Sequence, residues 1–255
     1  GRGVAGDTAT LGQTEHNTHF APVIYARGGL GVFRFGVLDS HFSKRAREGR
    51  LVRATLDSAM DYGFGVDENT ALLVSRADAH GTTHFSVLGA GGVFIADVRQ
   101  ARTPTHPQGH FTVDGVRAHY LLPGDTARVD ARGDLQVSLS SSLPLLPVAP
   151  QPAVVTRERL FDTGAYGFLQ LAADMGRSGA ALGYGSTIHS SDTRGLLLQP
   201  HYSATLPRDA HTRFRGSTTL PGMQPNAVAY TGLMVQFAPC DGACTAPRAI
   251  PAQTP

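Results

Sequence analysis

Apolar residues occur mostly in short runs along the chain, and one longer stretch alternates apolar and charged residues at helical spacing. The run FGVL (residues 35–38) is apolar and partly β-branched, which is typical of a buried strand. Residues 45–60 then place apolar or small side chains at helical intervals, with charges between them. These positions are Ala46, Leu51, Ala54, Leu56 and Ala59. The pattern predicts an amphipathic helix directly after the strand.

Several more short strands are predicted in the first half of the chain. YGFGVDENTALLVSR divides into two strands around a turn at residues 67–69. HFSVLG and GGVFIAD continue as strands that glycine turns separate. VRAHYLLPGDTARVD (residues 116–130) predicts a strand, a Pro-Gly turn and another strand.

Prolines gather in LPLLPVAPQPAVV (residues 143–155), which we interpret as a linker or an ordered strap. Beyond it, RERLFDTGAYGFLQLAADM predicts a helix interrupted at Gly164. The remainder is rich in turns, with short β-like pieces such as GLLLQPHYSATL. We therefore expect one domain part at residues 1–142, a Pro-rich linker at 143–156, and a C-terminal extension of unknown role at 157–255.

The composition is that of a globular protein, with 41% hydrophobic and 16% charged residues. A net charge of +2 is too small to indicate a nucleic-acid or membrane-surface partner. No run approaches the roughly 20 apolar residues that cross a bilayer. No signal peptide opens the chain, although a mature form would have lost one.

The two cysteines, Cys240 and Cys244, lie in PCDGAC near the C-terminus. Their spacing across Asp-Gly suits a small disulfide loop, which would fit an exported protein. Two thiols with no histidine pair nearby make only half of a zinc site, so the disulfide is the better interpretation. We therefore expect a secreted or periplasmic protein, with a cytoplasmic location as the alternative.

Residues suited to chemistry stand at the end of the first predicted strand. Asp39, Ser40 and His41 follow FGVL, and ligands of α/β sheets bind beyond the carboxyl ends of the strands. In the alternative interpretation, Asp39 or Ser40 caps the start of the helix and His41 is merely packed. The local sequence leaves both interpretations open.

The other histidines give weaker signals. HGTTH places His80 and His84 four residues apart, but Gly-Thr-Thr favours a strand or a turn, and no acid stands at ligand spacing. His106, His110 and His119 are scattered, and we expect them to be structural or exposed. The sequence therefore predicts neither a metal site nor a cofactor.

Two motifs together resemble a known family. DSHFSKRAREGRL is followed by GFGVDENTAL, which matches an acid, a polar residue, His-Phe, spaced arginines and Gly-Arg-Leu, then Gly-x-Gly-x-Asp-Glu-x-Thr-Ala. Both motifs, in this order and at this distance, resemble the cyanophycinase family of serine peptidases, which is related to the aspartyl dipeptidases. GGVFIAD and VDGVRAHYLLPGD also look like closing strands of that family. The resemblance covers roughly residues 30–128.

The resemblance implies a fold and two catalytic residues. The fold would be α/β, a three-layer sandwich with a largely parallel sheet similar to class I glutamine amidotransferases, incomplete in this chain and extended at its C-terminal end by mixed structure. His41 matches the general base, and Glu68 matches the carboxylate that orients it. A serine hydroxyl needs an imidazole to take its proton, and a carboxylate holds that imidazole in one tautomer. The alternative for Glu68 is a turn residue that caps DENT.

The resemblance also implies binding residues for cyanophycin, a polyaspartate that bears arginine on its side chains. Arg45, Arg47 and Arg50 match the arginines of the family, and guanidinium forks suit carboxylates and carbonyls. Asp39 would pair with a substrate guanidinium or with one of these arginines. Ser40 stands where glutamine is common in the family. In the alternative interpretation, the arginines are simply the solvated face of the helix.

The nucleophile of the family lies in a Gly-Thr-Ser-Ala-Gly elbow upstream of the histidine motif, and no G-x-S-x-G sequence occurs in these 255 residues. Ser186 in GYGST comes nearest, but it follows the histidine and lacks the second glycine. We therefore expect the chain to be the C-terminal part of a divided serine exopeptidase, with residues 1–142 as the C-terminal half of a cyanophycinase-like catalytic domain. The serine would be supplied by an N-terminal segment or chain. We also expect a homo-oligomer. The alternatives are an isoaspartyl or small-peptide hydrolase on the same scaffold, and a non-catalytic binding or assembly protein.

Overall fold

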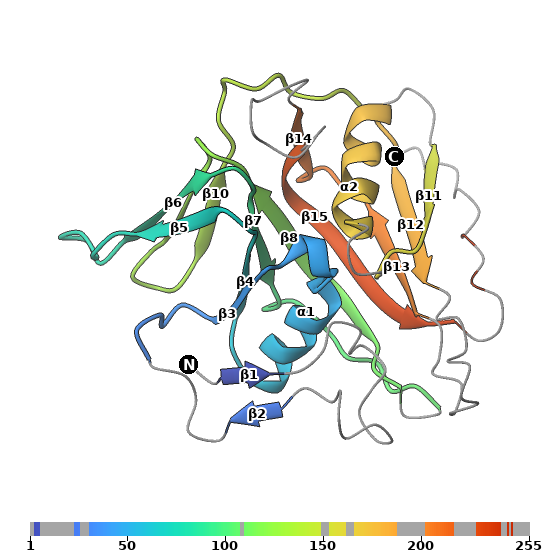
Figure 1. The fold of residues 1–255 in the computed structure, drawn as a ribbon, viewed down its shortest axis with the longest axis horizontal. Helices are drawn as coiled ribbons and strands as arrows, with labels where there is room; N and C mark the ends of the chain where they lie inside the picture. The colour runs from blue at the N-terminus through green and yellow to red at the C-terminus, as the bar shows by residue number, and fades with distance from the viewer. Residues whose placement is uncertain are drawn as a thin grey trace.

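The computed structural model describes residues 3–5, 23–25, 31–107, 110–148, 153–161, 166–187, 202–216, 228–240, 244 and 246. These residues form a nine-stranded sheet, a four-stranded sheet and a separate pair of short strands (Figure 1). Two α-helices of the described residues, α1 (Glu48–Asp57) and α2 (Gly167–Ser178), accompany the sheets. The protein is therefore α/β in class.

The nine-stranded sheet has the order β11-β12-β13-β15-β8-β7-β4-β3, and β14 pairs with β15. Its strands are β3 (Val37–Ser40), β4 (Tyr62–Val66), β7 (Val93–Asp97), β8 (Val113–Leu121), β11 (Val154–Glu158), β12 (Leu182–Thr187), β13 (Tyr202–Pro207), β14 (Arg213–Gly216) and β15 (Val228–Pro239). The four-stranded sheet, in the order β10-β9-β6-β5, contains β5 (Thr70–Val74), β6 (Thr83–Gly89), β9 (Thr126–Val129) and β10 (Leu135–Ser138). The separate pair is β1 (Gly3–Ala5) with β2 (Val23–Tyr25).

The large sheet is mixed, which corrects the expectation of a largely parallel sheet. Among the described strands, only β3 with β4 and β11 with β12 pair in parallel. The other pairs of this sheet are antiparallel. A parallel pair needs a long crossover, usually a helix, and α1 and α2 are the helices that supply one.

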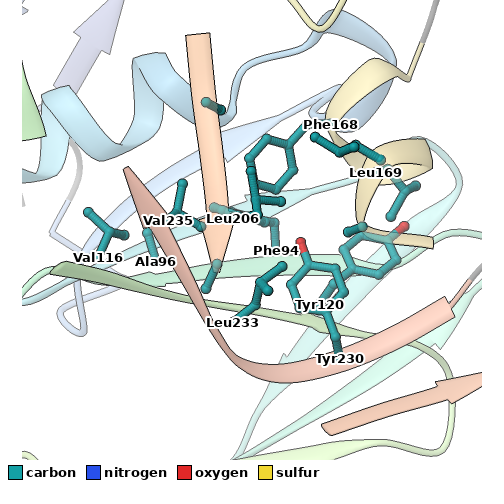
Figure 2. Close-up of a cluster of buried hydrophobic side chains, with 14 of the residues drawn as sticks. Phe94, Ala96, Val116, Tyr120, Phe168, Leu169, Leu206, Tyr230, Leu233 and Val235 are labelled. Atoms are coloured by element: carbon teal, nitrogen blue, oxygen red, sulfur yellow. The ribbon is translucent and has the colours of Figure 1, made fainter. Parts of the chain in front are cut away.

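Two cores lie on opposite faces of the large sheet. Along β7, Phe94 and Ala96 belong to one core and Ile95, between them, belongs to the other, because successive side chains of a strand point to opposite faces. The first core contains the apolar side chains of α1 and α2, and part of it is drawn in Figure 2. The second core lies against the four-stranded sheet. This order of layers does not confirm a glutamine amidotransferase-like sandwich.

The first predicted strand and helix are confirmed with shifted ends. Strand β3 spans Val37–Ser40, and a 3₁₀ turn, η1 (Ser43–Arg45), precedes α1. Ala46 separates the turn from the helix with a φ of 49°, in the left-handed region, so the helix begins later than the periodicity predicts. Helix α1 buries Leu51, Val52 and Ala54 on one face, as an amphipathic helix requires.

The second part of the helix predicted around Gly164 is observed as α2, from Gly167 to Ser178. The prediction of its first part is wrong, since Arg157 and Glu158 end strand β11 and residues 159–161 are not helical. Gly164 itself lies outside the described residues. Tyr166 stands at the N-cap with a φ of 51°, and Gly179 ends the helix with a φ of 71°, which glycine adopts without strain.

Strands from both sides of the proline-rich segment share the large sheet. β15 pairs with β8, so a strand of the expected extension lies at the centre of the sheet (Figure 1). Within the segment, Leu146 N–H donates to Phe214 O, and Pro144 O accepts from Gly216 N–H. Residues 144–146 therefore run along β14 as an ordered strap.

Candidate active site

His41 and Glu68 approach each other at one edge of the large sheet. β3 and β4 are parallel and pair Ser40 with Val66, so both strands end at the same edge. His41 follows β3 directly, and Glu68 follows β4 after Asp67. His41 Nδ1 lies 3.1 Å from Glu68 Oε1. The structure thus brings together the two residues that the sequence predicts to meet.

The hydrogen bond defines the tautomer that the pair requires. An ionised carboxylate only accepts, so the hydrogen in this bond lies on His41 Nδ1, and in the neutral ring Nε2 is then the nitrogen with the lone pair. The His41 side chain is 60% exposed, and that of Glu68 is 32% exposed. The imidazole is therefore oriented as a base and remains accessible.

Lys44 joins His41 and Glu68 as a third residue of the site. No sequence motif predicts this role for Lys44. Its Nζ donates to Glu68 Oε2 at 3.2 Å, from the η1 turn. The hydrogen bond from His41 has the largest effect in lowering the pKa of Glu68, and the hydrogen bond from Lys44 lowers it further. Lys44 is the only lysine of the chain, and this is the one sequence feature that could have drawn attention to it.

Glycines on β4 allow the residues around His41 to pack closely on the sheet. A Cβ at position 65 would lie 2.3 Å from the Phe42 ring, and one at position 63 would lie 2.5 Å from Thr55 Oγ1. Phe42, next to His41, is fully buried and stacks on Phe94. The Gly-x-Gly of the second motif therefore holds the segment of His41 against β4. His41 itself has a φ of 50°, a left-handed conformation that non-glycine residues rarely adopt.

Asp39, Arg47 and Arg50, which the sequence predicts to bind substrate, bind one another. Arg47 Nη1 donates to Asp39 Oδ1 at 2.9 Å, and Arg50 Nη2 donates to Asp39 Oδ2 at 3.0 Å. Arg47 Nη1 also donates to the Ser40 carbonyl at 2.6 Å. Burial lowers the pKa of Arg47, against the opposing effect of Asp39. Of the two roles considered for Asp39, the arginine pairing is the one observed.

Ser40 and Arg45 remain at the surface of this region. Ser40 is exposed, and its N–H donates to Asp39 Oδ1. Arg45 is exposed and makes no ion pair with the residues that the structure describes. Of the three predicted arginines, Arg45 is the exposed one.

Two further predicted features lie elsewhere. Cys240 and Cys244 form a disulfide with an S–S distance of 2.05 Å. His84 Nε2, on β6, lies 3.6 Å from Oδ2 of Asp78, which is exposed in the turn between β5 and β6. Within the described ranges, no group of three or more histidine, cysteine or acidic residues could hold a metal.

Tyr166 brings the C-terminal half of the chain to the site. Burial raises the pKa of Tyr166, Lys44 lowers it, and Glu68 and Asp67 raise it further. These charges act on the phenol because it stands near the site, at the N-terminal end of α2. No motif in the sequence marks Tyr166, since its nearness to residue 68 depends on long-range packing.

An accessible histidine oriented by a carboxylate, at the carboxyl ends of two strands in an α/β sheet, is typical of hydrolases with a histidine base. Over 101 residues, or 38% of the chain, the sequence is 33% identical to the cyanophycinase of Trichormus variabilis. The same values hold for the cyanophycinase of Nostoc sp.. The chain matches 32% of the length of each relative, so the similarity concerns only part of these proteins. No family model matches the chain.

Among the described residues, no helix is both long enough and apolar enough to span a membrane.

Proposed function

We propose that this chain is the C-terminal part of a cyanophycinase-like serine exopeptidase that hydrolyses cyanophycin or similar β-linked aspartyl peptides. The observation that carries the proposal is the 3.1 Å approach of His41 Nδ1 to Glu68 Oε1 at the edge of the sheet. The similarity to cyanophycinases supports the substrate class.

In the proposed reaction, a serine hydroxyl attacks the scissile carbonyl carbon while His41 Nε2 takes the hydroxyl proton. Glu68 stabilises the imidazolium that forms. The tetrahedral intermediate collapses, and His41 gives its proton to the leaving amine. His41 then activates a water molecule that hydrolyses the acyl-enzyme and restores the serine.

The serine is proposed to come from an N-terminal segment or chain, because the sequence has no G-x-S-x-G elbow. β3 ends the strand order, and within the described part of the chain nothing pairs with its outer edge. Leu38, in the middle of this strand, is 53% exposed. An open edge beside an exposed leucine supports a missing partner strand, since such edges are normally covered or charged.

The test is turnover of cyanophycin by the native protein, measured as the release of aspartyl-arginine dipeptides. His41→Ala is expected to lower kcat/KM by about 10²–10⁴-fold, because the base is lost. His84→Ala is the matched control, since His84 also lies beside a carboxylate but on β6, in the four-stranded sheet. Equal activity of wild type and His41→Ala would contradict the proposal.

A fluorophosphonate probe tests the source of the serine. It is expected to label a polypeptide that co-purifies with residues 1–255, or a segment joined to them. An active preparation in which intact mass shows only the 26.9 kDa species would contradict the divided enzyme. Activity on isoaspartyl dipeptides but not on cyanophycin would favour the small-peptide hydrolase, and no turnover of either would favour the binding protein.

A further inference from the structure

A buried carboxylate, Asp67, joins the two loops that carry His41 and Glu68. Asp67 immediately precedes Glu68 and is 5% exposed. Its Oδ1 accepts the backbone N–H of Ser43 at 2.8 Å, two residues after His41. One buried side chain thus links both halves of the histidine–carboxylate pair.

Tyr120 on β8 holds the other oxygen of this carboxylate. Its hydroxyl donates to Asp67 Oδ2 at 2.5 Å, and Gly92 N–H lies 3.4 Å from the same oxygen. Burial, with Asp67 adding to it, raises the pKa of Tyr120 well above its usual value, so the hydroxyl keeps its proton and donates. A Cβ at position 92 would lie 2.4 Å from Tyr120 Cζ, so glycine is needed for this approach.

The exposed pair needs this support. The His41 side chain is largely accessible to water and that of Glu68 is partly so, and an ion pair or hydrogen bond in water contributes little on its own. His41 is moreover held in a left-handed backbone conformation. Hydrogen bonds in a dry interior are stronger, so the Ser43–Asp67–Tyr120 chain can fix the loops where the surface contact cannot.

We propose that Asp67 and Tyr120 are positioning residues that hold His41 Nδ1 against Glu68. The inference rests on the proposed roles of His41 as base and Glu68 as its orienting carboxylate. Removing the Tyr120 hydroxyl leaves Asp67 Oδ2 with only the 3.4 Å contact from Gly92 N–H, which loosens both loops and lets the imidazole adopt the other tautomer.

Tyr230 supplies a matched control. It stacks on Tyr120 with ring centroids 6.0 Å apart, and both rings are at most 1% exposed (Figure 2). The Tyr230 hydroxyl is buried without a hydrogen-bond partner among the described residues. Tyr120→Phe and Tyr230→Phe therefore remove the same atom from neighbouring rings, but only the first removes a bond to Asp67.

The experiment is ¹⁵N NMR of the imidazole nitrogens in the full chain, with the His41 signals assigned from a His41→Ala spectrum. Wild type and Tyr230→Phe are expected to show the Nδ1–H tautomer for His41. Tyr120→Phe is expected to shift both nitrogens toward the averaged values of mixed tautomers. Because this measurement needs no substrate, its outcome is distinct from that of the turnover assay.

Unchanged His41 signals in Tyr120→Phe would overturn the inference, and so would equal changes in both tyrosine variants. If Tyr120→Phe does not fold, Asp67→Asn is measured in the same way. Its amide cannot accept from both Tyr120 and Ser43 as the carboxylate does. Unchanged His41 signals in Asp67→Asn would likewise overturn the inference. Where the protein turns over cyanophycin, Tyr120→Phe is expected to lower kcat roughly tenfold with little change in KM.

Discussion

Glu68 divides its two oxygens between two basic side chains. Oε1 faces the imidazole of His41, and Oε2 accepts from Lys44 Nζ. A carboxylate that receives hydrogen bonds in its charged form stays ionised to lower pH. The lysine therefore supports the histidine indirectly, by keeping its partner negative.

Lys44→Met is expected to raise the pKa of Glu68, because one hydrogen bond and one positive charge that favour the carboxylate are lost. The measurement is ¹³C NMR titration of the Glu68 carboxyl. Arg45→Met is the control, since it removes the same charge from the same turn without touching Glu68. An equal change in both variants would show a general charge effect and contradict a specific contact.

At the scale of elements, β8 and β15 are joined at a bulge by a buried histidine. The pairing of the two strands shifts register between Tyr230 and Leu233. There the Gly232 N–H donates to His119 Nδ1 at 3.2 Å, so this nitrogen is unprotonated, and Thr231 Oγ1 lies 2.7 Å from it. Protonation of Nδ1 would remove the acceptor that Gly232 and Thr231 share.

Burial lowers the pKa of His119 from 6.5 to about 4; Asp97 opposes this effect, and Arg117 and Arg99 add to it. The unfolded chain therefore binds a proton near pH 6.5, and the folded chain binds it only near pH 4. The free energy of unfolding should fall as pH decreases through this window, by about 3 kcal/mol in total, and then level off.

His119→Asn keeps an acceptor near the position of Nδ1 and removes the titration. Urea unfolding between pH 7 and pH 4 is expected to show a shallower loss of stability for this variant than for wild type. Identical pH slopes for the two proteins would contradict a neutral, buried His119.

At the scale of the whole molecule, the stacking of layers determines which faces and edges of the large sheet are covered. Helices α1 and α2 cover one face of the large sheet, and the four-stranded sheet covers part of the other. β3 ends the strand order, and Leu38 on it is exposed. The candidate active site thus lies beside one of the two edges that end the strand order of the described sheet.

Leu38→Lys is expected to weaken the association of the proposed serine-bearing partner about tenfold or more, because an apolar contact is lost and a charge must be desolvated. Co-purification and fluorophosphonate labelling measure this. Leu73→Lys is the control, since Leu73 is similarly exposed on β5. Equal yields of the partner with Leu38→Lys and wild type would contradict docking at β3.

The sequence by itself determined the local elements and the approach of His41 to Glu68. Periodicity decides whether a segment is strand or helix, and a strand–helix–strand unit brings the carboxyl ends of two parallel strands together. The spacing of Cys240 and Cys244 was sufficient for their disulfide, because the two residues are close along the chain.

Only the tertiary structure decided which distant strands pair and which polar groups are buried together. β8 and β15 are neighbours although more than a hundred residues separate many of their paired positions, and this pairing makes the sheet mixed. Asp67 and Tyr120 meet across a separation of 53 residues, and Asp39 receives Arg47 and Arg50 instead of standing free. Such contacts depend on how whole layers stack, because apolar periodicity marks a buried face without naming what covers it.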